Sequence, residues 1–222
     1  MQHRLPADIE RSSLAVIRRE LAEKGIALPA GTETVVCRVI HATADFDYAQ
    51  TLRFTPGAAE KGAAALGGGA DIVTDTNMAL AGISKAGLRK LGGTAHCFMA
   101  EEVIAAAAKE QGTTRAAASM AYAAERCPGA VYAIGNAPTA LFALAERIEA
   151  GLRPALVIAV PVGFVNVVES KERLFAVCER CGVPAIAAMG RKGGSSVAAA
   201  VCNALIYTAA DLLDPSARGW QG

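Results

Sequence analysis

Short apolar runs that are rich in β-branched residues alternate along the chain with longer segments that are rich in alanine. Short continuous apolar runs bounded by glycine, proline or polar residues are typical of strands buried on both faces of a parallel sheet. On this pattern we expect strands at residues 34–40, 71–74, 95–99, 130–134, 156–160 and 184–188.

The longer segments carry apolar residues at helical spacing. They predict helices at residues 45–54, 114–126, 139–150, 170–181 and 195–213. Alternating strands and helices indicate the α/β class, with a mostly parallel sheet in a three-layer α/β/α sandwich. No long linker or repeat interrupts the pattern, so we expect a single domain over residues 1–222.

A further amphipathic helix is expected at residues 8–24, ahead of the first expected strand. It stands outside the alternating pattern of strands and helices. Two positions are open to such a helix: it packs on its own sheet or on a neighbouring subunit.

Composition narrows the function classes. Lys plus Arg (22) nearly cancels Asp plus Glu (21), so the net charge of +1 supplies no field for holding a nucleic acid. No apolar stretch approaches the ~20 residues that span a bilayer, and we expect no membrane partner. Six cysteines are scattered through apolar segments, which favours a reducing cytoplasm.

His41 is the first candidate for chemistry. It directly follows the expected strand at residues 34–40, at the edge of the sheet where ligands bind in open α/β folds. An imidazole near its ordinary pKa is suited to general acid or base catalysis near neutral pH. The alternative is a histidine that only caps the corner.

The segment Gly190-Arg-Lys-Gly-Gly-Ser-Ser196 is the strongest backbone motif. Glycines allow close approach, and the start of the following helix offers free N–H groups to an anion. Gly193, Gly194 and Ser195 are therefore candidate binding residues, although a plain glycine turn is an equal alternative. The segment matches neither a phosphate loop nor a dinucleotide fingerprint.

Arg115 is expected in the first turn of a helix, where its charge opposes the helix dipole. Arginine is suited to clamp a carboxylate, although a solvated surface arginine is the alternative. Cys178 and Cys181 lack the second ligand pair that a structural zinc needs, so we expect them to pack in the core. The spacing of residues predicts no metal ligands and no cofactor.

Six motifs, in order, resemble the precorrin-8X methylmutase family of cobalamin biosynthesis. The resemblance runs from Ile9 to Tyr207 and rests on residues 38–48, 74–83, 135–142, 161–165, 169–171 and 190–195. It implies a flavodoxin-like fold, a homodimer and a corrinoid tetrapyrrole substrate. The family moves a methyl group from C-11 to C-12 of precorrin-8 or cobalt-precorrin-8, which gives hydrogenobyrinate or cobyrinate.

The resemblance also implies roles for particular residues. It makes His41 the catalytic histidine, and Ser13, Arg38 and Arg115 substrate contacts, with Ser12 as the alternative serine. The same resemblance, with the helix at residues 8–24, predicts a site that is completed across a dimer interface. Asn166-Val-Val168 stands where the family commonly has Gly-Ala-Ala, and larger side chains there would alter the pocket.

Two other functions are compatible with some of these features. A tetrapyrrole carrier without catalytic activity would need the same arginines and glycines but no titrating imidazole. A flavodoxin-like nucleotide binder is weaker, because the phosphate-loop spacing is missing. Among the two routes, the motifs are more similar to the cobalt-precorrin-8 branch.

Overall fold

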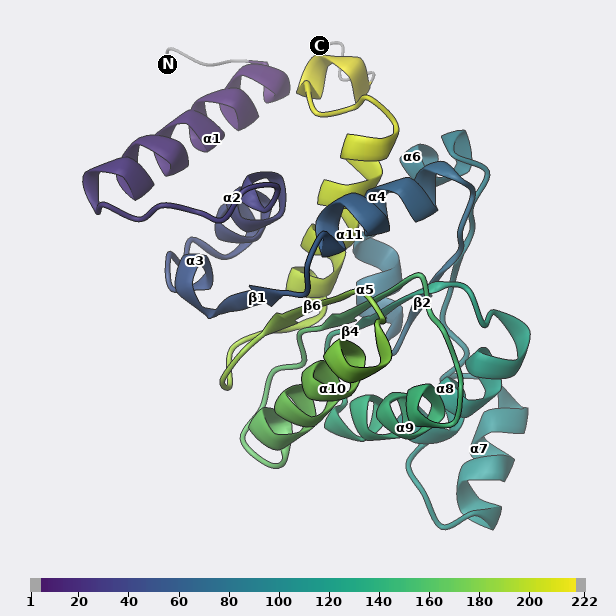
Figure 1. Ribbon diagram of the computed structural model, residues 1–222. Coiled ribbons are helices and arrows are strands. Elements are labelled where there is room, and N and C mark those ends of the chain that lie inside the picture. Colours follow the sequence, from purple (N-terminus) through teal and green to yellow (C-terminus); the bar gives the residue numbers. More distant parts are fainter. Residues whose placement is uncertain (1–4, 219–222) are drawn as a thin grey trace.

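The computed structural model describes residues 5–218, and its centre is a six-stranded sheet (Figure 1). The strand order is β1-β6-β5-β4-β2-β3, and only β1 is antiparallel to its neighbour. The strands are β1 (Leu52–Phe54), β2 (Ile72–Thr74), β3 (Ala95–His96), β4 (Val131–Ile134), β5 (Leu156–Ala159) and β6 (Ala185–Ala188).

The five parallel strands have the order of a flavodoxin-like doubly wound sheet. Numbered among themselves along the chain, β3-β2-β4-β5-β6 become 2-1-3-4-5. The carboxyl ends of these strands therefore meet at one edge of the sheet, where loops that hold ligands are found in this fold. The predicted α/β sandwich is confirmed.

Helices cover both faces of the sheet, and alternate residues of the strands point to each side. Along β4, Val131 and Ala133 pack into one apolar core, whereas Tyr132 and Ile134 pack into the other. The first core lies under α2 (Glu33–Thr43), α4 (Ala58–Gly67), α5 (Asn77–Gly82), α6 (Lys85–Lys90) and α11 (Ser195–Ala209). The second lies under α8 (Arg115–Arg126), α9 (Pro138–Glu149) and α10 (Val167–Cys181), with α7 (Glu102–Glu110) packed on α8.

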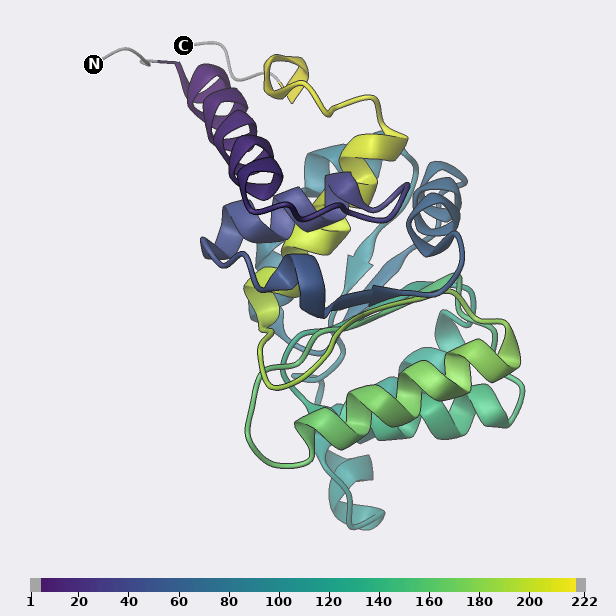
Figure 2. The same ribbon diagram turned by 60° about the vertical axis from the view of Figure 1, so that its left-hand side comes forward.

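The first helix, α1 (Pro6–Glu23), extends from the body of the protein rather than lying on the sheet (Figure 2). One side of α1 packs on α2 and on the 3-10 helix η1 (Pro215–Arg218), so the two ends of the described chain lie side by side. The other side exposes Leu5, Ile9 and Val16. α1 thus has an apolar stripe that residues 5–218 leave uncovered.

The expected strand at residues 34–40 is wrong: this segment is helix α2. Val35, Val36, Val39 and Ile40 are buried, and their spacing is that of one helix face. The face packs on α11, and this burial outweighs the preference of valine and isoleucine for strands. His41 therefore lies in the last turn of a helix, not after a strand.

The expected helix at residues 45–54 is also largely wrong. Only α3 (Tyr48–Thr51) is helical, and the segment continues as β1, which pairs with β6 at the edge of the sheet. The expected strand at 95–99 is reduced to β3, and the helix expected at 195–213 ends at Ala209. The other predicted strands and helices are confirmed within a few residues.

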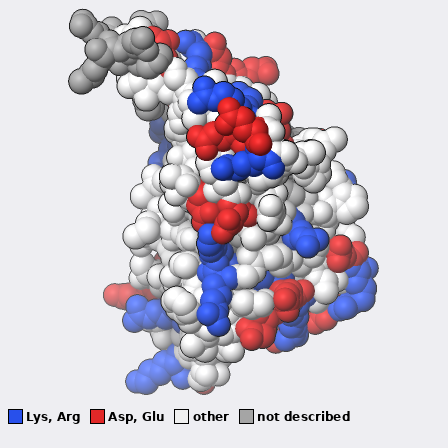
Figure 3. All heavy atoms as spheres, turned by 90° about the vertical axis from the view of Figure 1, so that its left-hand side faces the viewer, with Lys and Arg blue, Asp and Glu red and all other residues white. Residues whose placement is uncertain are grey.

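Surface charge is mixed on the face that carries α1, α2 and α3. Figure 3 shows positive and negative groups next to one another on this face, with wide uncharged areas between them. Within residues 5–218, no helix combines the length and apolar character that crossing a bilayer requires.

Candidate active site

Ser13 and His41 meet between α1 and α2. The Oγ atom of Ser13 lies 2.8 Å from Nδ1 of His41, in hydrogen-bonding range. His41 is at the solvent-exposed surface, in the last turn of α2, and Ser13 is half-buried. Of the two candidate serines, the structure therefore brings Ser13 to the histidine of its own chain.

A buried carboxylate, Glu10, joins three separate segments beside this pair. It forms an ion pair of 2.7 Å with Arg38 of α2, and its two oxygens accept hydrogen bonds of 2.8 Å from Arg218 of η1. Both guanidinium groups lie over the ring of Tyr207, at 5.3 and 4.1 Å from its centroid. The cluster holds α1, α2 and η1 in place under the Ser13–His41 pair.

The cluster contains two positive groups and one negative group, and this balance acts on His41. Partial desolvation and the charge of Arg38 lower the pKa of His41 below its ordinary value, and Glu10 opposes them only in part. The imidazole is therefore less readily protonated in the free protein than an unperturbed histidine.

Glu10 itself stays ionised. Burial alone would raise the pKa of this carboxyl group, but the hydrogen bonds from Arg218 and Arg38 hold it below the usual range. Arg38 is consequently already paired in this structure. Its side chain is only 12% exposed, which places it under the site as a positioning group.

The glycine loop lies where β6 ends and α11 begins, at the carboxyl edge of the sheet. A Cβ atom on Gly193 would collide with the carbonyl oxygens of Val160 and Pro161, the latter at 2.6 Å, so only glycine fits there. Gly194 has a φ of 136° and donates its N–H to the carbonyl of Val160. That N–H group is therefore not free for a ligand.

Two lysines fix the same loop. Lys171 is fully buried, and its Nζ donates to the carbonyls of Gly190 and Lys192 at 2.9 and 2.8 Å. Burial lowers the pKa of Lys171 to about 8. Lys192 pairs with Asp45 and Asp47, both at 2.6 Å, so its charge is neutralised within the chain. The loop is thereby joined to the segment that follows α2.

The neighbouring loops at this edge expose apolar side chains. Phe164 and Val165, in the connection from β5 to α10, are 82% and 76% exposed, and Met78 at the start of α5 is 72% exposed. The guanidinium of Arg191 lies 5.6 Å from the ring centroid of Phe164. Exposed aromatic and aliphatic groups beside a cation form a surface suited to a flat apolar ligand with acidic substituents.

Arg115 is not near the Ser13–His41 pair. It begins α8, whose residues pack in the core on the opposite face of the sheet from α2. The hydroxyl groups of Thr114 and Thr139 lie 2.8 Å apart, which sets the start of α8 beside the start of α9. Arg115 and His41 therefore lie on different sides of the sheet within one chain.

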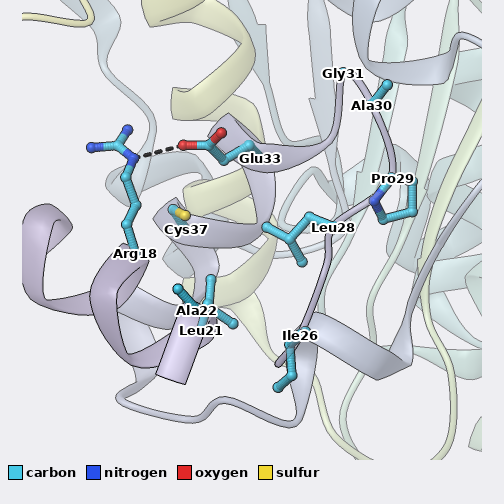
Figure 4. Close-up of a pocket in the computed structure, with 10 residues that line it drawn as sticks. All are labelled: Arg18, Leu21, Ala22, Ile26, Leu28, Pro29, Ala30, Gly31, Glu33 and Cys37. Atoms are coloured by element: carbon cyan, nitrogen blue, oxygen red, sulfur yellow. Dashed lines mark hydrogen bonds and ion pairs between the residues drawn. The ribbon is translucent and has the colours of Figure 1, made fainter. Parts of the chain in front are cut away.

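A well-formed pocket lies at the other end of the α1–α2 contact (Figure 4). Its cavity of about 330 Å³ is mostly apolar, and Arg18 and Glu33 form an ion pair at its rim. None of the candidate site residues lines it. The pocket therefore does not contain the chemistry that the sequence indicates.

Several residues of the site escape sequence reasoning. Glu10 and Arg218 are 208 residues apart in the chain, and no local spacing links them. Lys171 lies in a quoted motif, but its burial under the loop is a property of the fold. Asp75, also in a quoted motif, is buried and accepts hydrogen bonds from the N–H groups of residues 135–137, which joins the loops after β2 and β4.

Fold and site together define a flavodoxin-like α/β protein with a hydrogen-bonded serine–histidine pair beside the sheet. The family model described as precorrin-8X methylmutase matches residues 8–208 of this chain. The chain belongs to the precorrin-8X methylmutase family, and it is an enzyme of the isomerase class.

Individual relatives agree with this assignment. The precorrin-8X methylmutase of Pseudomonas aeruginosa is 44% identical over 89% of this chain and 93% of its own length. The cobalt-precorrin-8 methylmutase of Salmonella typhimurium is 42% identical over 91% of this chain and 95% of its own. The crystal structure of precorrin-8X methyl mutase from Thermus thermophilus matches with a TM-score of 0.81 and 41% identity, over 91% of this chain and 98% of that one.

Proposed function

We propose that this enzyme moves a methyl group from C-11 to C-12 of precorrin-8 or cobalt-precorrin-8, with His41 as the general acid. The products would be hydrogenobyrinate or cobyrinate. The observation that carries the proposal is the Ser13–His41 hydrogen bond, in a chain that belongs to this family. Both residues are those to which the family resemblance assigns a part in the reaction.

The reaction needs a proton but no net change in oxidation state. His41 donates a proton to a nitrogen or a conjugated carbon of the macrocycle, which makes the ring system an electron sink. The methyl group leaves C-11 and forms its new bond at C-12 while the positive charge is delocalised over the ring. The proton then returns to the imidazole, so atoms and electrons balance.

Ser13 positions the imidazole for this step. With Nδ1 held by the hydroxyl group, Nε2 is the atom left to face the substrate, and no side chain within residues 5–218 forms a hydrogen bond with it. The lowered pKa makes the imidazolium a stronger acid but a rarer one in the free enzyme. Substrate carboxylates near His41 would raise its pKa and charge it only when substrate is bound.

The carboxyl edge of the sheet supplies the surface for the macrocycle. Phe164, Val165 and Met78 offer apolar contact, and Arg191 and the first N–H groups of α11 offer donors for acidic substituents. Gly193, Gly194 and Ser195 shape this surface. The substrate-binding roles of Arg38 and Arg115 remain predictions.

A homodimer that shares the site is also part of this proposal. Proton transfer to a macrocycle is favoured where water is excluded, and His41 is exposed in the single chain. The apolar stripe of Leu5, Ile9 and Val16 on α1 offers a surface for a second copy. Arg115 lies on the other face of the sheet from His41 of its own chain. In a shared site, the Arg115 side chain that reaches His41 would therefore come from the partner subunit.

This arrangement changes the expectation from the sequence. The sequence predicts that the helix with Ser13 completes the neighbour's pocket, whereas Ser13 contacts His41 of its own chain. Activity should therefore not be restored by mixing Ser13 and His41 variants. The pair to mix is His41 and Arg115.

The route is assigned from the motifs, and the cell compartment from the cysteines. Relatives with both names are similarly identical to this chain, at 44% and 42%, so the preference for the cobalt-precorrin-8 branch rests on the motifs. All six cysteines are free thiols, which supports the cytoplasm as the setting.

The direct test is turnover by the His41→Ala enzyme. The visible spectrum of purified protein mixed with precorrin-8 follows the reaction, and the same titration with product measures binding. We expect isomerisation to fall by about 10²–10⁴-fold, with product affinity largely kept, because contacts hold the ligand and the proton drives the rate. Near-normal turnover by His41→Ala would overturn His41 as the acid, and product binding without turnover by the wild-type protein would favour the carrier alternative.

A mixing experiment tests the shared site. His41→Ala and Arg115→Ala enzymes are each assayed alone, then exchanged and assayed together. If the partner supplies Arg115, the mixture should recover about a quarter of normal activity, since each mixed dimer has one intact site. Mixing His41→Ala with Ser13→Ala is the matched control, and its activity should not exceed the average of the two enzymes assayed alone. A fully active monomer in sedimentation would overturn the dimer.

A further inference from the structure

Asp71, His96 and Cys127 come together at a place that the proposed reaction does not use. Asp71 precedes β2, His96 ends β3 and Cys127 follows α8, just before the chain enters β4. Asp71 and Cys127 thus lie at the amino ends of their strands, opposite to the glycine loop. β3 is the edge strand of the sheet, so the cluster borders the surface.

The three side chains bring three different metal-binding atoms together. A carboxylate oxygen, an imidazole nitrogen and a thiol sulfur all lie within 4.8 Å of one another. Nε2 of His96 is 3.2 Å from Oδ2 of Asp71. Ligands of a tetrahedral zinc ion lie about 3.3–3.7 Å apart, given metal–ligand distances of about 2.0–2.3 Å. The nitrogen and the oxygen, 3.2 Å apart, are close to that spacing, and the sulfur reaches it by a movement of about 1 Å at most.

Neighbouring groups orient two of the three donors. The backbone N–H of Thr94 donates to Oδ1 of Asp71 at 2.8 Å, which turns the other oxygen toward His96. The ring of Phe98 stacks on that of His96 with centroids 5.6 Å apart and an interplanar angle of 6°. Phe98 in turn packs edge-on against Tyr122, 5.2 Å away. Outer contacts of this kind fix ligand orientation in metal sites.

We propose that Asp71, His96 and Cys127 bind a divalent cation of the zinc type. The combination of one thiolate, one imidazole and one carboxylate selects a borderline metal such as Zn²⁺ over Mg²⁺ or Ca²⁺, which prefer oxygen ligands alone. His96, Asp71 and Cys127 are each partly exposed, so water can reach the cluster as the fourth ligand. Binding releases the proton of the Cys127 thiol to solvent.

The position of the cluster indicates what the metal does. It would add a link between β2, β3 and the segment that enters β4, which are also joined by the pairing of β2 with β3 and with β4. Asp71 and Cys127 lie at the amino ends of their strands, and His41 lies on the other side of the sheet from α8, so the metal would stabilise this edge without entering the reaction.

Zinc binding by the untagged, reduced full-length protein tests the proposal. Metal retained after dialysis against Zn²⁺, and calorimetric titration with Zn²⁺ alone, measure stoichiometry and affinity. We expect one Zn²⁺ per chain, and affinity at least ~10-fold weaker in Cys127→Ser and in Asp71→Asn, since even outer-shell changes cost that much. Cys181→Ser is the matched control, because Cys181 is another partly exposed cysteine outside the cluster, and it should bind normally.

Two further measurements test whether Cys127 is a ligand of the metal. Alkylation of Cys127, mapped by mass spectrometry, should be slowed by Zn²⁺, while alkylation of Cys181 should not. With Co²⁺ in place of Zn²⁺, the wild-type protein should show a thiolate-to-cobalt charge-transfer band that Cys127→Ser lacks. Equal zinc uptake by wild-type and Cys127→Ser proteins, or unchanged alkylation of Cys127, would overturn the site and leave His96 and Asp71 as a simple hydrogen-bonded pair.

Discussion

His41 and His96 are the same kind of side chain in two regions that make different use of it. His41 lies on a helix, takes a hydroxyl group as its partner, and is close to two arginines. His96 lies on an edge strand, takes a carboxylate as its partner, and is close to a thiol. A hydroxyl partner leaves the imidazole free to exchange a proton, whereas a carboxylate and a thiol add further metal-binding atoms.

The different partner atoms favour different proposed chemistry in the two regions, namely proton transfer at His41 and metal binding at His96. The carboxylates also differ. Glu10, beside His41, is buried between two arginines, whereas Asp71, beside His96, is 37% exposed and has no arginine among its ion-pair partners within residues 5–218. Buried ion pairs join the segments of the first region, whereas the ion pair of the second region is partly exposed. Variants of the two regions should therefore differ in turnover, in stability and in pH dependence.

The largest difference is expected in turnover. His41→Gln should lower the rate of isomerisation by about 10²–10⁴-fold, because the general acid is lost. His96→Gln should leave the rate within about two-fold of normal, because this side chain lies away from the proposed reaction. Parallel steady-state assays of the two purified variants check this. Equal losses in both would end the distinction between the two regions.

Stability should separate the two carboxylates. Glu10→Gln leaves Arg38 and Arg218 without their counter-charge and should lower the free energy of unfolding by about 3–5 kcal/mol. Asp71→Asn changes a partly exposed pair and should cost about 0–1 kcal/mol. Urea unfolding at pH 7 followed by circular dichroism measures both. A smaller loss for Glu10→Gln than for Asp71→Asn would show that the buried cluster does not hold α1 and η1.

The same ion pairs predict how stability depends on pH. Because the pKa of Glu10 is lowered in the folded protein, its contribution is present above the unfolded value of about 4.5 and is lost as the pH falls through the folded pKa. The free energy of unfolding, measured in steps of about one pH unit from pH 5 to pH 3, should therefore fall more for the wild-type protein than for Glu10→Gln. Parallel curves for the two proteins would contradict this assignment.

Ser13→Ala should have a smaller effect on catalysis. The variant loses one hydrogen bond worth about 1 kcal/mol, so kcat should fall by about five- to ten-fold while His41 remains able to act. Ser12→Ala is the matched control, because Ser12 is the adjacent serine on α1, and it should be close to normal. A loss as large as that of His41→Gln would mean that Ser13 touches the reacting atoms.

The smallest expected effect is a shift between two pH profiles. A general acid acts when protonated, so kcat/KM should fall as pH rises through the pKa of His41 in the free enzyme, below about 6.5. If substrate carboxylates raise that pKa, the fall of kcat should occur at higher pH than the fall of kcat/KM. Coincident profiles would mean that bound substrate does not charge His41.

The local pattern of residues in the sequence determines much of the fold of this protein. Continuous apolar runs such as residues 130–134 and 156–160 predict the central strands correctly, because strands buried on both faces need apolar residues throughout. The glycine loop and the helix after it were also predictable, since glycine is required where backbones approach closely. The motif resemblance indicates Ser13 and His41 individually, and their contact is a property of the fold.

Tertiary structure alone decided the rest. Residues 34–40 have the composition of a strand, but packing on α11 makes them a helix, because burial of one face outweighs intrinsic preference. The Glu10 cluster and the Asp71, His96 and Cys127 cluster join residues that are far apart in the chain. Spacing in a sequence predicts ligands that lie on one element, as in a Cys-x-x-Cys pair. It cannot predict ligands that only the pairing of β2 with β3 and β4 brings together.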